Sequence, residues 1–136
     1  KVPLLLELKD PLFLEPTHAM ALANMLASTG MSEQVALMSF HFEHVQSVAA
    51  ADPKLAIGYI SALNPIPRRH AKLLGPWWPL LLINPFYAMW GHAQGSIVAP
   101  LDPTPEGRIR LYKMLNVDAL LADNPAAVIA AVDKVY

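Results

Sequence analysis

The chain has 136 residues, a formal net charge of −1 and no cysteine. Hydrophobic residues make up 54% of it and charged residues 15%, which fits a folded domain and excludes a disordered polyelectrolyte. The near-neutral charge gives no general attraction to nucleic acid or anionic lipid, and the lack of cysteine excludes disulfides and thiolate sites. We expect a single domain over residues 1–136, and the compartment stays open.

Six short apolar runs recur along the chain, and each is the length of a buried strand. They cover residues 2–8, 34–40, 55–61, 79–84, 96–101 and 117–122. The first reads as a strand buried on both sides, although Glu7 and Lys9 stand at its end. None of these runs is long enough to form a membrane-spanning helix, so we expect no integral membrane segment.

Segments with helical spacing separate most of these runs. After the first run, Leu22, Met25, Leu26 and Thr29 fall on one helical face, and Gly30 is placed to end that helix. After the second run, Val45, Val48 and Ala49 predict a helix that ends at Asp52-Pro53. The segment RRHAKLL after the third run is a poor helix candidate, and the loop 65–72 reads as solvated.

Three further helices are expected after the later runs. Asn84 and Pro85 are placed to begin the first of them and Gly95 to end it. Thr104-Pro105 and Asn124-Pro125 are equivalent starts for the other two. Strands and helices therefore alternate, as parallel βα units require, over about six units. An open doubly wound sheet fits this pattern, and so does part of a TIM barrel, which has eight units.

Glu7 and Lys9 lie on one face of the first predicted strand, at its carboxyl end. α/β folds place their ligand sites at this end of the strands. A carboxylate and an ammonium group side by side there can bind a hard cation and a phosphate oxygen, respectively. The alternative is an ordinary ion pair at the end of a strand.

The order of several segments resembles the glycerophosphodiester phosphodiesterase family, whose fold is a TIM barrel. The matching segments are VPLLLELK (2–9), QVALMSF (34–40), LAIGYI (55–60), HAQG (92–95) and NVDALLADNP (116–125). The resemblance implies a partial (β/α)8 barrel that corresponds to the last six βα units, with the first two strands missing. The family's His-Arg-Gly, Glu-x-Asp and second His-Asp segments have no match here, so its acid–base histidines are not found.

The resemblance also implies roles for individual residues. Glu7 is expected to be a ligand of a divalent cation, Mg²⁺ or Ca²⁺, and Lys9 a catalytic residue on the phosphate side. Ser39 and His41 follow the second predicted strand, and Leu101 replaces an aromatic residue of the family. We expect these three to contact a small phosphodiester substrate.

The remaining chemically notable residues have simpler interpretations. The five histidines lack metal-ligand spacing, and His92 fits the end of a helix. Asp118 and Asp123 are expected to be turn and cap residues. The region rich in aromatic residues at 77–90 is expected to be core or interface, with a ligand platform as the alternative.

The sequence therefore predicts metal-dependent hydrolysis of glycerophosphodiesters to an alcohol and glycerol phosphate, incomplete in this chain alone. The alternative is a non-catalytic, truncated relative that serves as a binding or scaffold module. Open sheet edges would favour self-association, so a homo-oligomer is also possible.

Overall fold

The structure, a computed structural model, describes residues 3–135, so Val2 of the first predicted strand lies outside the described residues. The chain folds into two compact units. Unit 1 runs to Ile60 and includes Ala71–Leu73, while unit 2 comprises Ser61–His70 and the chain from Leu74 onward.

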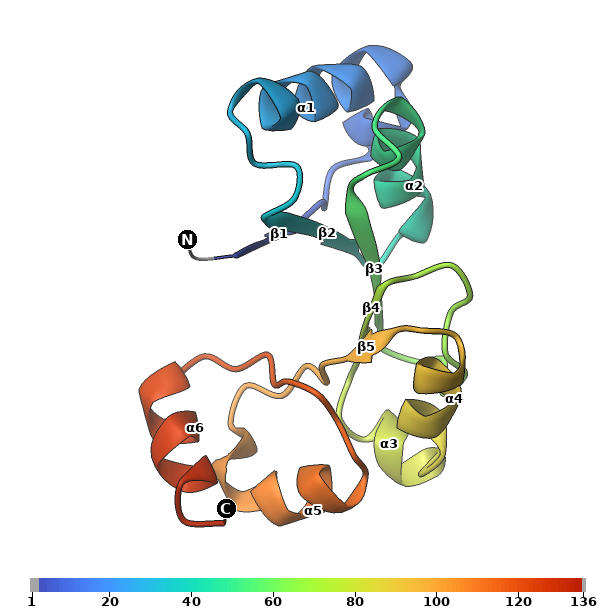
Figure 1. The fold of residues 1–136 in the computed structure, drawn as a ribbon. Helices are drawn as coiled ribbons and strands as arrows, with labels where there is room; N and C mark the ends of the chain where they lie inside the picture. Colours follow the sequence, from blue (N-terminus) through green and yellow to red (C-terminus); the bar gives the residue numbers. More distant parts are fainter. Residues whose placement is uncertain (1–2, 136) are drawn as a thin grey trace. The chain divides into compact units, whose positions relative to one another are not determined.

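Five strands form a sheet in the order β1-β2-β3-β4-β5 (Figure 1). The strands are β1 (Leu4–Glu7), β2 (Val35–Ser39), β3 (Ala56–Ser61), β4 (Leu73–Pro76) and β5 (Ile97–Val98). The β1–β2 and β2–β3 pairs are parallel. The prediction of parallel strands that alternate with helices is therefore confirmed.

Unit 1 buries its core between the sheet and two helices, α1 (Pro16–Ser28) and α2 (Phe42–Ala51), which pack against each other. A 3₁₀ helix, η1 (Pro11–Leu14), precedes α1. Both α-helices lie on the same side of β1–β3 (Figure 1). The core includes Leu37 and Met38 of β2 and Phe42, Val45 and Val48 of α2, all of them buried. The face predicted for α2 is thus the face that packs.

The face predicted for α1 is partly wrong. Met25 and Thr29 are exposed, whereas Ala19, Ala23 and Leu26 are buried. The contact face is therefore built from two alanines and one leucine, because small side chains let the helix approach its neighbours closely. Gly30 does follow the helix in the left-handed conformation, with φ +68°.

In unit 2, short helices follow β4, β5 and the last apolar run. They are α3 (Leu80–Ile83), α4 (Tyr87–Ala93), η2 (Pro105–Arg108), α5 (Ile109–Met114) and α6 (Pro125–Val132). Asn124 caps α6 by accepting a hydrogen bond from the Ala127 amide at 3.2 Å, as its position predicts. The segment 62–72 contains no helix, in agreement with the poor helical pattern of RRHAKLL.

Two predicted strands are wrong. The run 79–84 contains helix α3 (Leu80–Ile83) and no strand; a short apolar run reads alike as a strand or a helix. Leu80 and Leu81 are buried, and Leu82 and Ile83 are exposed. The fourth strand of the chain is instead β4, which precedes this run. Residues 117–122 form no regular strand, and only Leu121 makes a parallel bridge, with Leu101.

The expectation that the first strand is buried on both sides is also wrong. Leu4 and Leu5 are both more than 40% exposed. In the described sheet β1 is an edge strand that pairs with β2 alone, so its side chains lack a second neighbouring strand. The charges at its end are consequently not buried within an apolar layer.

Gly58 allows β3 to approach its neighbours in unit 1. A Cβ atom at this position would lie 2.8 Å from the Leu73 carbonyl oxygen and 2.9 Å from Cγ of Met38. We expect Gly58→Ala to destabilise the protein by about 1–3 kcal/mol, because backbone must shift to accommodate the methyl group. Thermal unfolding followed by circular dichroism measures this change.

Gly107 provides the matched control, because a Cβ atom there meets no atom within 4 Å. Gly107→Ala should leave the unfolding temperature unchanged or slightly raised. Equal effects of the two substitutions would contradict the packing assigned to Gly58.

Candidate functional site

The parallel pairing of β1 and β2 brings four of the predicted site residues together. The pairing sets Glu7 opposite Met38 and continues with a 2.8 Å hydrogen bond from the Leu8 amide to the Met38 carbonyl. β1 and β2 therefore end at the same edge of the sheet, which is the edge where α/β folds place ligands. A shallow pocket of about 350 Å³ lies there, lined by Glu7, Leu8, Lys9, Ser39, Phe40 and His41.

Glu7 and Lys9 form an ion pair at the mouth of this pocket. The Lys9 Nζ atom lies 3.4 Å from Oε2 of Glu7, and the two side chains are 77% and 34% exposed, respectively. Because both groups reach water, an ion pair of this kind contributes at most about 1 kcal/mol to stability. The ion pair therefore adds little to the stability of the fold, and stability alone does not explain why these two charged residues stand here.

Ser39, which lines the pocket, connects the two strand ends. Its hydroxyl donates to the Leu8 carbonyl at 2.6 Å and accepts from the His41 amide at 3.0 Å, and the residue is buried. The single hydroxyl proton is thus used within the protein. This arrangement fixes the backbone on both sides of the pocket.

His41 stands at the N-cap position of α2 and leaves most of its side chain exposed. Its ring centroid lies 5.1 Å from that of His44, and its Nδ1 atom lies 3.9 Å from Oε1 of Glu43. His44 is buried, and its Nδ1 atom has no hydrogen-bond partner. Among residues 3–135, no group of three or more histidine and acidic side chains could hold a metal ion.

Leu101 belongs to unit 2 and is not among the residues that line this pocket. It makes parallel bridges with Trp77 on one side and Leu121 on the other. The position that is aromatic in the glycerophosphodiester phosphodiesterase family is therefore aliphatic here. The residue opposite it across the parallel bridge is a tryptophan, Trp77.

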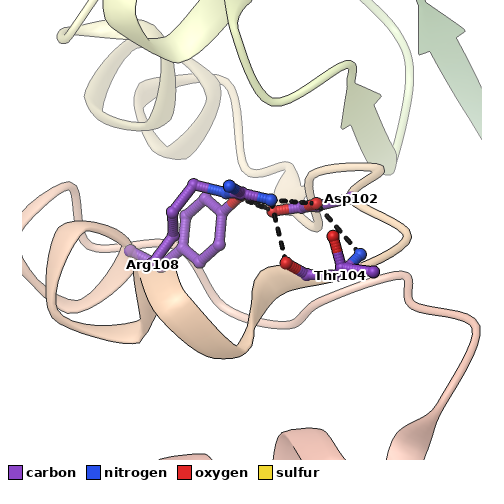
Figure 2. A network of polar contacts seen from close by, with 4 residues as sticks. Asp102, Thr104 and Arg108 are labelled. Carbon is purple, nitrogen blue, oxygen red and sulfur yellow. Dashed lines mark hydrogen bonds and ion pairs between the residues drawn. The ribbon is translucent and has the colours of Figure 1, made fainter.

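Asp102 follows Leu101 and forms a buried network that the sequence did not predict (Figure 2). Arg108 donates to it twice, from Nε at 2.8 Å and from Nη2 at 2.7 Å, and the Tyr112 hydroxyl donates to Oδ2. Nη2 of Arg108 also donates to the Thr104 carbonyl at 2.8 Å. The guanidinium carbon lies 4.2 Å from the centre of the Trp78 ring, in cation–π geometry.

The protonation states in this network follow from its contacts. Burial alone would raise the pKa of Asp102, but hydrogen bonds from Arg108 and Tyr112 outweigh it and hold that pKa below its ordinary value. The hydrogen bonds to Asp102 raise the pKa of Arg108. Burial, followed by the bond to Asp102, raises the pKa of Tyr112. The network therefore holds one carboxylate, one guanidinium and one neutral phenol.

His92 and Asp118, which the sequence predicts to be a helix-end residue and a turn or cap residue, make a second polar contact in unit 2. Nε2 of His92 lies 2.8 Å from Oδ2 of Asp118, and the same oxygen accepts from the Val98 amide at 2.7 Å. Asp118 thus joins the end of α4 to β5. This contact fits the structural interpretation of both residues.

Comparison with solved structures identifies the fold. A Galdieria sulphuraria protein with a proposed glycerophosphodiester phosphodiesterase activity superposes with a TM-score of 0.84 at 20% identity, over 96% of this chain and 57% of that one. An Oleispira antarctica phosphodiesterase, solved with the product sn-glycerol-3-phosphate, gives 0.74 at 22% identity, over 96% and 55%. A glycerophosphodiester phosphodiesterase from Parabacteroides distasonis gives 0.75 at 14% identity, over 96% and 56%.

The chain thus spans little more than half the length of the structures that it matches. No protein-family model and no curated protein sequence matches it. The resemblance noted from the order of sequence segments is confirmed at the level of the fold: the chain has the fold of part of a glycerophosphodiester phosphodiesterase barrel.

Asp102 should make the stability of unit 2 depend on pH. Because its pKa is lowered in the folded state, its contribution is present above the unfolded pKa of about 3.9 and is lost as the pH falls through the folded pKa. We expect Asp102→Asn to cost about 2–3 kcal/mol at pH 7 and much less at pH 2 to 3. Urea unfolding followed by tryptophan fluorescence measures this, since all three tryptophans lie in unit 2.

Asp123→Asn is the matched control. Asp123 also follows a bridge-forming residue, Leu121, but its side chain is exposed. Its substitution should change stability by less than about 0.5 kcal/mol at either pH. A cost of Asp102→Asn that stays the same from pH 7 to pH 2 would refute the charge assigned to Asp102.

Proposed function

We propose that this chain forms part of a hydrolase that cleaves glycerophosphodiesters to an alcohol and glycerol phosphate with the help of a divalent cation. The observation that carries the proposal is the position of Glu7 and Lys9, which lie side by side at the carboxyl end of β1 in the fold of known phosphodiesterases. A carboxylate and an ammonium group at this edge of a parallel sheet suit a phosphate-containing substrate, because the negative charge of the phosphate must be neutralised.

Lys9 is the residue that we propose to bind the phosphodiester oxygens. Its ammonium group is on the open side of the pocket, and its pairing with Glu7 at 3.4 Å is loose enough to be exchanged for a phosphate oxygen. As negative charge develops on those oxygens during hydrolysis, a fixed cation stabilises the transition state more than the ground state. In this proposal Lys9 contributes to the rate as well as to binding.

Glu7 is the residue that we propose as a ligand of Mg²⁺ or Ca²⁺. A partly exposed carboxylate is a suitable ligand for a hard cation. It does not complete a site, because the described part of the chain holds no cluster of three or more acidic or histidine side chains. When bound, such a cation would neutralise charge on the phosphodiester, and substrate oxygens, backbone carbonyls or waters can fill its other coordination positions.

Ser39 and His41 have different parts in this proposal. The Ser39 hydroxyl already bonds to Leu8 and His41, so Ser39 acts on substrate through the backbone that it holds in place. His41 lines the pocket with a mostly exposed side chain, and we propose that it contacts the alcohol part of the substrate. Leu101 lies in unit 2 and does not line the pocket, so its contact with substrate stays a prediction from the sequence.

The alternative function is a binding or scaffold module that lacks catalysis. It fits the described residues, whose histidine and acidic side chains form no cluster of three or more that could hold a metal ion. The two functions differ in one measurable respect, which is turnover.

The test is release of sn-glycerol 3-phosphate from a glycerophosphodiester in the presence of Mg²⁺ or Ca²⁺. It should be applied to this chain and to any longer polypeptide encoded by the same gene. We expect Glu7→Gln and Lys9→Met each to lower kcat/KM by about 100-fold, the loss typical of removing a group that stabilises transition-state charge. Chelation of the cation should abolish the residual activity.

Glu33→Gln is the matched control, because Glu33 is an exposed carboxylate of unit 1 outside the pocket. Its kcat/KM should equal that of the unmodified protein. Absence of turnover in every form of the protein would favour the scaffold alternative, and turnover unchanged by Glu7→Gln would exclude the proposed role of that residue.

A further inference from the structure

Unit 2 contains a long stretch without charge. No aspartate, glutamate, lysine or arginine occurs between Lys72 and Asp102. This stretch builds β4, α3, α4 and β5. Helices on the surface of a globular protein normally carry charged residues on their outer face, so the outer faces of α3 and α4 are unusual.

The outer face of this region is apolar as well as uncharged. Ile83 is 69% exposed and Phe86 59%, and Leu82, Met89 and Trp90 are also exposed. The inner side is already occupied, because Leu80 and Leu81 of α3 and Tyr87, Ala88 and Gly91 of α4 are buried. The outward residues are therefore not needed for the core of unit 2.

The loop that joins β3 to β4 extends this surface. Leu63 and Ile66 on the loop are both exposed, Leu63 almost fully. Asn84, which follows α3, donates from Nδ2 to the Pro65 carbonyl at 2.7 Å and accepts from the Phe86 amide at 3.1 Å. The bond to Pro65 holds the loop beside the α3–α4 turn, and the bond from Phe86 lies within that turn, so the exposed side chains form one neighbourhood.

We call this neighbourhood the apolar surface; it consists of Leu63, Ile66, Leu82, Ile83, Phe86, Met89 and Trp90. The rings of Phe86 and Trp90 are stacked, with centroids 6.5 Å apart. Arg68 and Arg69 follow Ile66 and Pro67 on the same loop and are exposed. Clustered exposed apolar residues of this kind on a protein surface mark an interaction site.

We propose that the apolar surface binds the interface of a lipid bilayer that contains anionic lipids. Aromatic and large aliphatic side chains favour the boundary between headgroups and acyl chains, and the neighbouring arginines match anionic headgroups. No aspartate or glutamate, which such headgroups would repel, occurs in the sequence between Asp52 and Asp102. The helices described within residues 3–135 include none with the length and hydrophobicity of a membrane span.

The test uses the whole chain and vesicles of phosphatidylcholine, with or without phosphatidylglycerol. We expect flotation with the vesicles that contain phosphatidylglycerol, weaker flotation with phosphatidylcholine alone, and quenching of tryptophan fluorescence by brominated acyl chains. Ile83→Asp and Phe86→Asp should each lower the partition coefficient at least about 10-fold, since each withdraws a large apolar side chain from the bilayer. Arg68→Gln with Arg69→Gln should remove the preference for phosphatidylglycerol.

Met25→Asp is the matched control, because Met25 on α1 of unit 1 is similarly exposed, at 55%. It should leave partitioning unchanged, and circular dichroism should show that every variant is folded. The proposal fails if the unmodified protein neither floats nor shows quenching, or if Phe86→Asp and Met25→Asp bind vesicles equally well. It also fails if the apolar surface instead pairs two copies, seen as a dimer that Phe86→Asp dissociates while vesicles bind neither form.

Discussion

The parallel register of β1 against β2 is the constraint on which the candidate site depends. Side chains alternate along a strand, so a shift of one residue would turn Glu7 to the opposite face of the sheet. The amide of Leu8 bonds to Met38, and the hydroxyl of Ser39 bonds back to Leu8, so the register is fixed at the edge where the ligand pocket lies. Backbone pairing of apolar segments thus determines where the charged groups meet.

The same rule, applied in unit 2, produces a different result. Trp78 and Asp102 follow residues that make a parallel bridge, and both therefore stand at the carboxyl end of their strands. There Asp102 is fully buried, and its charge is matched by Arg108 and its lone pairs by Tyr112. The exposed ion pair of unit 1 is open to exchange with a ligand, whereas this buried network is closed on itself and chiefly stabilises its surroundings.

How far the sequence predicts this structure depends on the kind of signal. Local signals succeed in part: Gly30 adopts positive φ and Asn124 caps its helix, because each depends only on neighbouring backbone. Two similar signals fail, since Thr104 makes no side-chain cap bond and α4 begins after Phe86 and not after Asn84. Residues 79–84 fail because an apolar run of this length reads alike as a strand or a helix until its burial is known. The Asp102 network could not be predicted, since the fold, not the spacing along the chain, brings Trp78 to Arg108. The pocket around Glu7 could be anticipated, because parallel strands bring their carboxyl ends together.

The most direct measurement of the central claim is an experimental structure of the protein with Ca²⁺ and sn-glycerol 3-phosphate. The account predicts that a Glu7 carboxylate oxygen lies within about 2.6 Å of the cation and that the Lys9 ammonium group has turned from Glu7 to a phosphate oxygen. If Glu7 and Lys9 remain paired with each other while cation and phosphate bind elsewhere, the account is contradicted.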